Sequence, residues 1–255
     1  MGRVISIVNQ KGGVGKTTSL VEMLFQAGNL GKKCLAVDLD PQSNATKMLT
    51  GEEWDPSVYD LLIGQNKALT LRDVVQPASQ DWPNVIVLPA SKMLGTVEPH
   101  LLTRMNRERV LKNLLAPVRD AFDLILIDLP PTVNQLTVNA LVASDAYIVP
   151  TDVSEYARDG VRTVKDTADA IRESGNNPDL EFIGVFFTSF QKGGAHAVRQ
   201  LVEDLVDDYG AKVLGTRVPD SVKVTESQKA RRPVGALDPE HAVSRAYAQL
   251  MEVIL

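Results

Sequence analysis

Cysteine, aromatic residues and long apolar runs are all scarce in this chain of 255 residues. Cys34 is the single cysteine, which excludes a disulfide framework and an iron–sulfur cluster held by several thiolates. No apolar run approaches the roughly 18 residues that a membrane-spanning helix requires. We therefore expect a cytoplasmic protein without a signal peptide, whose Cys34 is a buried core thiol rather than a ligand or nucleophile.

An excess of positive charge is missing as well. The chain has 27 Lys and Arg against 32 Asp and Glu, a net charge of −5 and a pI near 5.3. Any binding to nucleic acid must then depend on a local basic patch. The composition, 44% hydrophobic and 23% charged, fits a single globular domain over residues 1–255 with a sizeable core.

Short apolar runs alternate along the chain with segments of helical periodicity. The expected strands are residues 4–8, 34–38, 85–88, 124–128, 146–150, 182–187 and 213–214. The expected helices are residues 20–30, 161–171, 198–206 and 243–254. Most of the strands are continuously apolar, which is typical of strands buried on both faces of a parallel sheet. The sequence therefore predicts a doubly wound α/β fold with a mostly parallel sheet, and short helices in the irregular segment 50–84.

The most informative segment follows the first expected strand and reads Asn-Gln-Lys-Gly-Gly-Val-Gly-Lys-Thr-Thr. The glycines let backbone N–H groups surround phosphate oxygens, Lys16 can reach the β- and γ-phosphates, and the Thr17 hydroxyl can ligate Mg²⁺. The sequence thus predicts an ATP–Mg²⁺ site. Its phosphate-binding residues are Lys11, Gly12, Gly13, Val14, Gly15, Lys16, Thr17 and Thr18.

Lys11 replaces the first glycine of the usual P-loop pattern. This loop resembles the deviant P-loop of the ParA/MinD family of dimerising ATPases. The resemblance implies a homodimer with ATP between its subunits, in which Lys11 crosses the interface and touches the nucleotide of the other subunit. A second cation beside the transferring phosphoryl group stabilises the charge that develops there, so Lys11 and Lys16 are both candidate catalytic residues.

Two acidic strand ends complete the expected site. The block Asp38-Leu39-Asp40-Pro41-Gln42 is similar to the second motif of that family, which implies that Asp40 positions the attacking water and lies by the metal while Asp38 supports the site. The apolar run 124–127 ends in Asp128-Leu129-Pro130-Pro131, which resembles the third motif and implies that Asp128 holds Mg²⁺, usually through water. Further resemblance places Thr188 and Pro219 near the adenine.

The flanking residues favour the ParA branch. Asn9-Gln10 and Pro41-Gln42 look like ParA partition ATPases, and residues 249–255 carry no base, which makes them a poor anionic-membrane anchor. The resemblance implies non-specific DNA binding in the ATP state, nucleoid association, and an adaptor of the ParB type that stimulates slow hydrolysis. The candidate DNA-binding cations are Lys192, Arg199, Arg217, Lys223, Lys229, Arg231 and Arg232. Relatives often carry arginine after the Val-Pro turn, where this chain has Asp220.

Three alternatives remain open at this point. A ParA-like ATPase can separate plasmids or chromosomes, or it can position a protein cargo such as a chemoreceptor array or carboxysome. A membrane-cycling ATPase of the MinD type would bind anionic vesicles with ATP. A metabolic P-loop enzyme that phosphorylates or ligates a small molecule would work as a monomer and would not need Lys11.

Overall fold

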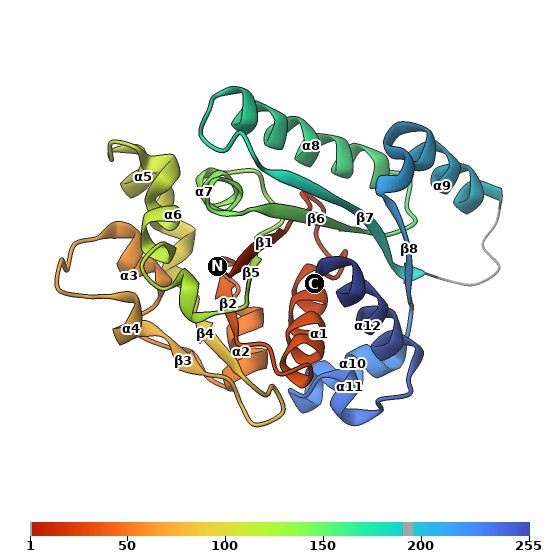
Figure 1. Cartoon of the computed structure of the whole chain (residues 1–255), viewed down its shortest axis with the longest axis horizontal. Helices are drawn as coiled ribbons and strands as arrows, with labels where there is room; N and C mark the ends of the chain where they lie inside the picture. Colours follow the sequence, from red (N-terminus) through yellow and green to blue (C-terminus); the bar gives the residue numbers. More distant parts are fainter. Residues whose placement is uncertain (1, 191–195) are drawn as a thin grey trace.

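A single eight-stranded sheet with helices on both faces forms the fold (Figure 1). This computed structural model describes residues 2–190 and 196–255. The strands are β1 (Arg3–Ile7), β2 (Cys34–Asp38), β3 (Gln76–Pro77), β4 (Val85–Leu88), β5 (Leu124–Asp128), β6 (Ala146–Thr151), β7 (Glu181–Phe190) and β8 (Val213–Pro219). Their order is β3-β4-β2-β5-β1-β6-β7-β8, and every pair except β3–β4 is parallel. The predicted α/β class and largely parallel sheet are confirmed.

The helices divide between the two faces of the sheet. The α-helices are α1 (Lys16–Asn29), α2 (Asn44–Thr50), α3 (Val58–Ile63), α4 (Leu71–Val74), α5 (Val97–Leu102), α6 (Val110–Leu115), α7 (Gln135–Ala143), α8 (Ala157–Glu173), α9 (His196–Tyr209), α10 (Val222–Ala230), α11 (Val234–Leu237) and α12 (Ala242–Ile254). Short 3-10 turns in the described residues are η1 (Lys92–Thr96), η2 (Arg107–Arg109), η3 (Arg119–Ala121) and η4 (Gly210–Lys212). One apolar cluster packs α3 to α9 on one face, and a second packs α1, α2, α11 and α12 on the other.

The predicted strands match the observed ones in position, but β7 runs three residues beyond the predicted 182–187 and two differences lie at the sheet edges. The β8 strand runs five residues beyond the predicted 213–214, through the polar stretch Gly215-Thr216-Arg217, because an edge strand needs no continuous apolar run. The two-residue β3, which includes Pro77, has no apolar pattern and was not expected. Cys34 lies in the core as predicted, and burial raises the pKa of its thiol to about 12, so it is a poor nucleophile.

The central strands bring three chain segments to one edge. Ile7 of β1 lies beside Asp128 of β5, and Asp128 lies beside Asp38 of β2 in the parallel register. The P-loop follows β1 directly, so its glycines and both acidic strand ends meet at the carboxyl edge of the sheet, where ligands bind in such folds. Among the helices of the described residues, none has both the length and the apolar character needed to cross a membrane.

Candidate functional site

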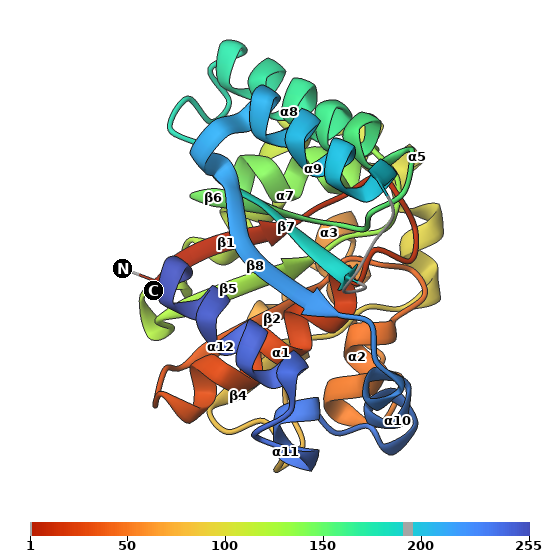
Figure 2. The same ribbon diagram turned by 90° about the vertical axis from the view of Figure 1, so that its right-hand side faces the viewer.

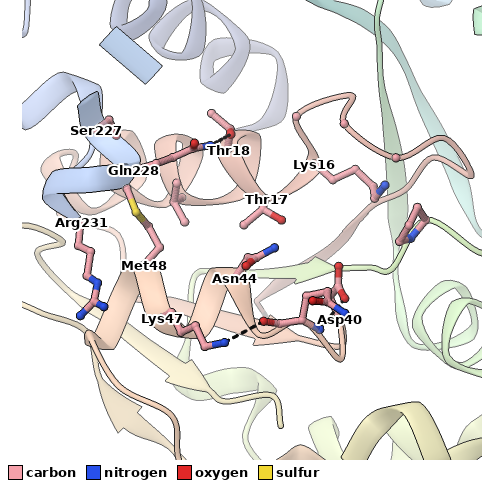
Figure 3. Close-up of a pocket in the computed structure, with 16 residues that line it drawn as sticks. Lys16, Thr17, Thr18, Asp40, Asn44, Lys47, Met48, Ser227, Gln228 and Arg231 are labelled. Atoms are coloured by element: carbon pink, nitrogen blue, oxygen red, sulfur yellow. Dashed lines mark hydrogen bonds between the residues drawn. The ribbon is translucent and has the colours of Figure 1, made fainter. Parts of the chain in front are cut away.

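A cavity of about 660 Å³ opens at this carboxyl edge, between the P-loop, α2 and α10 (Figure 3). The P-loop and the start of α1 form one wall, α2 forms another, and the end of α10 closes the third. Its lining residues are Gly12, Gly13, Gly15, Lys16, Thr17, Thr18, Val21, Asp40, Gln42, Asn44, Lys47, Met48, Pro131, Ser227, Gln228 and Arg231. Most of the residues predicted to bind phosphate are therefore brought together around one space.

The P-loop depends on glycine at two positions. Gly13 and Gly15 have φ values of 77° and 75°, a left-handed conformation that strains residues with a Cβ. A Cβ on Gly13 would meet no atom within 4 Å, whereas one on Gly15 would lie 3.5 Å from the methyl group of Thr188. Gly15 immediately precedes α1, so the loop delivers free backbone amides to the positive end of a helix dipole, a favourable place for phosphate.

Lys16 is nearly buried, with 7% of its surface exposed, and its ammonium donates a hydrogen bond of 3.0 Å to the carbonyl of Lys11. Burial lowers the pKa of Lys16, while the carboxylates of Asp128 and Asp40 act in the opposite direction. Because the Lys16 ammonium donates to a neutral carbonyl, it can exchange this bond for one to a phosphate oxygen.

Thr17 and Asp128 form a pair suited to a divalent cation. The Thr17 hydroxyl donates to Oδ2 of Asp128 at 2.7 Å, and Oδ1 of Asp128 is buried without a hydrogen-bond partner among the described residues. Burial, and then the charge of Asp38, raise the pKa of Asp128 to about 8. A buried carboxyl with an unused oxygen next to a hydroxyl fits Mg²⁺, which keeps water ligands and takes few from the protein. The part of the chain that the structure describes holds no cluster of three or more His, Cys, Asp or Glu side chains for a metal, so phosphate oxygens would have to supply further ligands.

Asp38 and Asp40 have different surroundings. Asp38 is fully buried and accepts hydrogen bonds from the amide of Asp40 at 3.0 Å and from the amide and hydroxyl of Thr46 at 2.8 and 2.7 Å. Burial raises the pKa of Asp38 to about 6. Asp40 lines the cavity and accepts from the amide of Gln42 at 2.9 Å. Asp38 therefore orients the loop, and Asp40 presents a carboxylate to the space beside the P-loop.

Sequence reasoning missed Thr46, which ties this loop to the neighbouring strand. Its hydroxyl donates to Asp38 and also accepts from the amide of Ala90 at 2.9 Å, just past β4. Thr46 lies one turn into α2, eight residues after Asp38, and is fully buried. A buried hydroxyl in a short helix gives no recognisable pattern in a single sequence, so its role appears only with the fold.

Lys11 does not line the cavity of its own chain. Its ammonium forms an ion pair with Asp152 and donates to the hydroxyl of Ser154 at 2.6 Å, both in the loop after β6. Its amide donates to the Asn9 side chain at 2.9 Å, and Asn9 in turn donates to the carbonyl of Pro150 at 2.8 Å. These bonds fix the first part of the P-loop to the end of β6. Asp152 and Ser154 were not predicted as site residues.

The two residues predicted near the adenine lie elsewhere than in the cavity wall. Thr188 is buried under the P-loop, where its hydroxyl hydrogen-bonds the carbonyls of Val14 at 2.9 Å and Thr151 at 3.2 Å. Pro219 ends β8 opposite Phe190 of β7 and is not among the lining residues. Ser227, Gln228 and Arg231 of the α10 region line the cavity instead, and the sequence carried no sign of this for Ser227 and Gln228.

The candidate DNA-binding cations differ in their surroundings. Lys223 pairs with Glu226 at 2.8 Å and Arg232 pairs with Asp81 at 3.0 Å. Arg231 lines the cavity and donates to the carbonyl of Gly51 at 2.6 Å. Lys192 lies outside the described residues.

Two further cations lie far apart, and a third is turned inward. Arg199 on α9 and Lys229 on α10 are exposed, on helices that Figure 2 shows well separated. The guanidinium of Arg217 is 4.4 Å from the centre of the Phe187 ring, and partial burial lowers its pKa. Arg217 therefore contributes to packing between β7 and β8.

Known proteins are similar to this chain in sequence and in fold over nearly its whole length. A family model described as an AAA domain matches residues 2–182. The chromosome-partitioning ATPase Soj of Treponema pallidum is 35% identical over 258 residues, with 100% of this chain and 98% of the relative covered. The chromosome partitioning protein ParA of Myxococcus xanthus is 32% identical, with coverage of 98% and 87%.

A solved structure adds a bound nucleotide. The cobyrinic acid a,c-diamide synthase of Mycobacterium smegmatis, solved with ADP and magnesium, is 30% identical and superposes with a TM-score of 0.83 over 99% of this chain and 93% of that one. The fold, the P-loop with Lys11 and the similarity to partitioning ATPases over the whole chain all indicate the same family. The chain belongs to the ParA family of ATPases, within the ParA/MinD superfamily.

Proposed function

We propose that this protein is an ATP-driven switch for DNA partition. It binds ATP with Mg²⁺ in the cavity at the carboxyl edge of the sheet, dimerises around two nucleotides, and binds DNA non-specifically in that state. Hydrolysis, slow by itself and stimulated by an adaptor of the ParB type, releases the DNA. The cargo is a plasmid or chromosome, and the protein is cytoplasmic and nucleoid-associated. Relatives named for chromosome partitioning support this choice.

The observation that carries the proposal is the position of Lys11. Lys16 already supplies a buried ammonium to the cavity of its own chain, while the ammonium of Lys11 lies outside that cavity on Asp152 and Ser154. The Lys11 side chain remains 30% exposed, so it can exchange Asp152 for a phosphate of another subunit. A cation delivered from a second subunit makes the complete active site conditional on dimerisation.

The residues of the cavity divide the work of hydrolysis. Backbone amides of the P-loop bind the phosphates, and Lys16 stabilises the charge that develops on the transferring group. Thr17 and Asp128 would hold Mg²⁺, which supplies charge neutralisation to the phosphates when bound. Asp40 is placed to accept a hydrogen bond from the attacking water and to orient it. Thr188 acts from beneath, by fixing the carbonyl of Val14 in the loop.

DNA binding in this proposal rests on few cations per subunit. Arg199, Lys229 and Arg231 are the exposed candidates without an ion pair among the described residues, whereas Lys223 and Arg232 pair with neighbouring carboxylates. Arg231 is held by a hydrogen bond to the carbonyl of Gly51. A net charge of −5 makes a monomer a weak ligand for DNA. Dimerisation doubles the number of phosphate contacts and so raises affinity steeply, which makes DNA binding depend on ATP.

Retention on non-specific duplex DNA tests the proposal. We expect the wild type to be retained with ATP and Mg²⁺ but not with ADP, and the retention to fall steeply with salt. Lys16→Ala should abolish nucleotide binding and therefore retention. Lys11→Ala should still bind ATP as a monomer but fail to dimerise on light scattering. Equal retention with ATP and ADP would reject the switch.

Two other functions can be separated from this one. The 30% identity to a diamide synthase favours, as second candidate, an enzyme that ligates a small molecule, which would turn over as a monomer and tolerate Lys11→Ala. A ParA-like protein that positions a protein cargo would pass the DNA test but would be stimulated by an adaptor other than a centromere-binding one. A MinD-like protein would instead sediment with anionic vesicles in the presence of ATP.

A further inference from the structure

One buried carboxyl group has no part in the chemistry described above. Glu22 lies on α1, five residues after Thr17, and none of its surface is exposed. Its Oε1 accepts a hydrogen bond of 2.6 Å from the amide of Val234, at the start of α11. Its Oε2 is buried without a hydrogen-bond partner among the described residues. A carboxyl with one oxygen unsatisfied in a core is costly, so its retention calls for an explanation.

The segment that Glu22 holds is continuous with one wall of the nucleotide cavity. Ser227, Gln228 and Arg231 line the cavity, and three residues after Arg231 the chain enters α11 at Val234. The seat of α11 on α1 is tight, because a Cβ on Gly235 would lie 2.3 Å from the ring of Phe25. Figure 2 shows α10 and α11 beside one another below the end of β8.

The outer contacts of this wall are few and exposed. Arg231 donates to the carbonyl of Gly51 past α2, Arg232 pairs with Asp81, and Gln228 reaches the Thr18 hydroxyl only at 3.5 Å. Exposed ion pairs of this kind contribute little to stability. Of the hydrogen bonds and ion pairs named here, the bond from Val234 to Glu22 is the buried one, and it adds to the apolar packing that holds the wall against α1.

We propose that Glu22 is a positioning residue for the nucleotide cavity: its carboxyl group holds α11 on α1 and thereby fixes the α10 wall, and its ionisation loosens that hold. The inference rests on the proposed nucleotide site. In the closed arrangement an ionised Oε2 would gain no partner, and it can be hydrated only if α11 moves away from α1. Nucleotide held behind this wall should therefore leave faster when Glu22 is charged.

The groups that face Glu22 keep their charge state near neutral pH, so Glu22 is the group that titrates there. The start of α11 offers the amides of Val234 and Gly235, and α12 offers Tyr247, whose hydroxyl is 3.0 Å from that of Ser19. The pKa of Tyr247 is raised above its ordinary value by burial, so it stays neutral through the physiological range. Burial raises the pKa of Glu22 itself to about 7. The cations that precede Val234 in the sequence, Arg231 and Arg232, are engaged with Gly51 and Asp81.

Two measurements on the full chain test this inference. For wild type, the dissociation rate of a fluorescent ADP analogue should rise at least about fivefold from pH 6 to pH 8 relative to Glu22→Gln, which keeps the acceptor without the charge. Comparison with Glu22→Gln removes the contributions of Asp38 and Asp128, which titrate in both proteins. Tyr247→Phe, a change in the same core that introduces no neutral-pH titration, should keep the wild-type pH dependence.

Hydrogen exchange at the Val234 and Gly235 amides provides the readout that needs no nucleotide. Their protection, corrected for intrinsic exchange, should fall at least about fivefold from pH 6 to 8 in wild type relative to α7, and stay level in Glu22→Gln. Unchanged protection in wild type would overturn the inference, even if Glu22→Gln failed to fold. A wild type that binds no nucleotide but shows the exchange change would reject the proposed function while leaving the role of Glu22 in place.

Discussion

The phosphate edge formed by β1, β2 and β5 and the outer edge formed by β7 and β8 are built differently. Strands β1, β2 and β5 are each five residues long and are buried throughout or nearly so. β5 pairs with β1 and with β2 in an unbroken register. Between β7 and β8 the register shifts twice, and β8 is only half buried. The candidate phosphate-site side chains at the first edge are held by backbone and hydroxyl groups, whereas most candidate DNA-binding cations lie on α9 and in the α10 segment, before and after β8 in the chain.

This difference decides how well the candidate site residues of each region can be predicted from the sequence. A P-loop and two carboxylates at strand ends need fixed spacing, because phosphate and metal geometry leave little freedom. Long cationic side chains can instead pair with any carboxylate within reach, as Lys223 does with Glu226 and Arg232 with Asp81. Groups that must be held in a fixed geometry are recognisable as a sequence motif, whereas surface charges are not.

Removing the buried cation of the phosphate edge should have the largest effect. Lys16→Ala should weaken ATP binding by at least about 100-fold, or about 2.7 kcal/mol, because the ammonium lies among phosphate-binding amides with little access to solvent. Calorimetric titration with ATP and Mg²⁺ measures this. Lys11→Ala is the matched control, and an equal loss of monomer binding in both variants would contradict the different positions of the two lysines.

Substitution of Asp40 and of Asp38 should affect two different properties, ATP hydrolysis and folding stability, although the residues are two positions apart. Asp40→Ala should lower ATP hydrolysis at least about 100-fold while ATP binding persists, because its carboxylate faces the cavity. Asp38→Ala should cost about 2–4 kcal/mol of unfolding free energy, because two amides and a hydroxyl lose their acceptor. Phosphate release and urea unfolding measure the two effects. Normal hydrolysis by Asp40→Ala would remove it from the catalytic residues.

Glu22 tests whether a core position on the P-loop helix carries a pH dependence. Its folded pKa, raised to about 7, lies above the unfolded value, so the folded state binds more protons and loses stability as pH rises from about 4.5 to about 7. Glu22→Gln removes that cost, and the variant should gain up to about 3 kcal/mol over wild type at pH 8 but little at pH 4.5. Urea unfolding at both pH values measures the gain, and an equal effect at both would contradict it.

The cations of the α10 segment should give the smallest effects. Lys229→Ala should lower DNA affinity in the ATP state about two- to fivefold and reduce the salt slope by about 1 per site, because its cation is exposed and without an ion pair among the described residues. Arg232→Ala should have less effect, because Asp81 already neutralises that charge. Fluorescence anisotropy on a short duplex at several salt concentrations compares them. A larger loss for Arg232→Ala would mean that the ion pair opens on DNA.

Much of the site near the phosphates could be predicted because its residues are neighbours in sequence. Gly13, Gly15, Lys16 and Thr17 lie within five positions, and Asp128 ends a strand that is recognisable by its apolar run. The partners of these residues could not be predicted in the same way. Thr46, Asp152 and Ser154 come from other elements, and no spacing rule connects them to the P-loop.

The α10 wall shows the same limit. Arg231 was predicted as a DNA contact from its place in a basic cluster, but it lines the cavity and bonds to Gly51, 180 positions away. Arg231 has a φ of 49° at the end of α10, where the chain turns toward α11, and its side chain reaches the Gly51 carbonyl just past α2. A side chain at such a turn has its direction set by the fold and not by its neighbours in sequence.

Periodicity and motif spacing are local properties of the chain, so the sequence alone was enough to predict the α/β class, the strand edge expected to bind ligands, and the candidate phosphate-binding residues. Only the tertiary structure decided where the charged groups act: Lys11 on Asp152, Arg231 in the cavity wall, and Glu22 buried beneath α11. The physical reason is that charge is governed by burial and by partners from distant elements, and both exist only once the chain has folded.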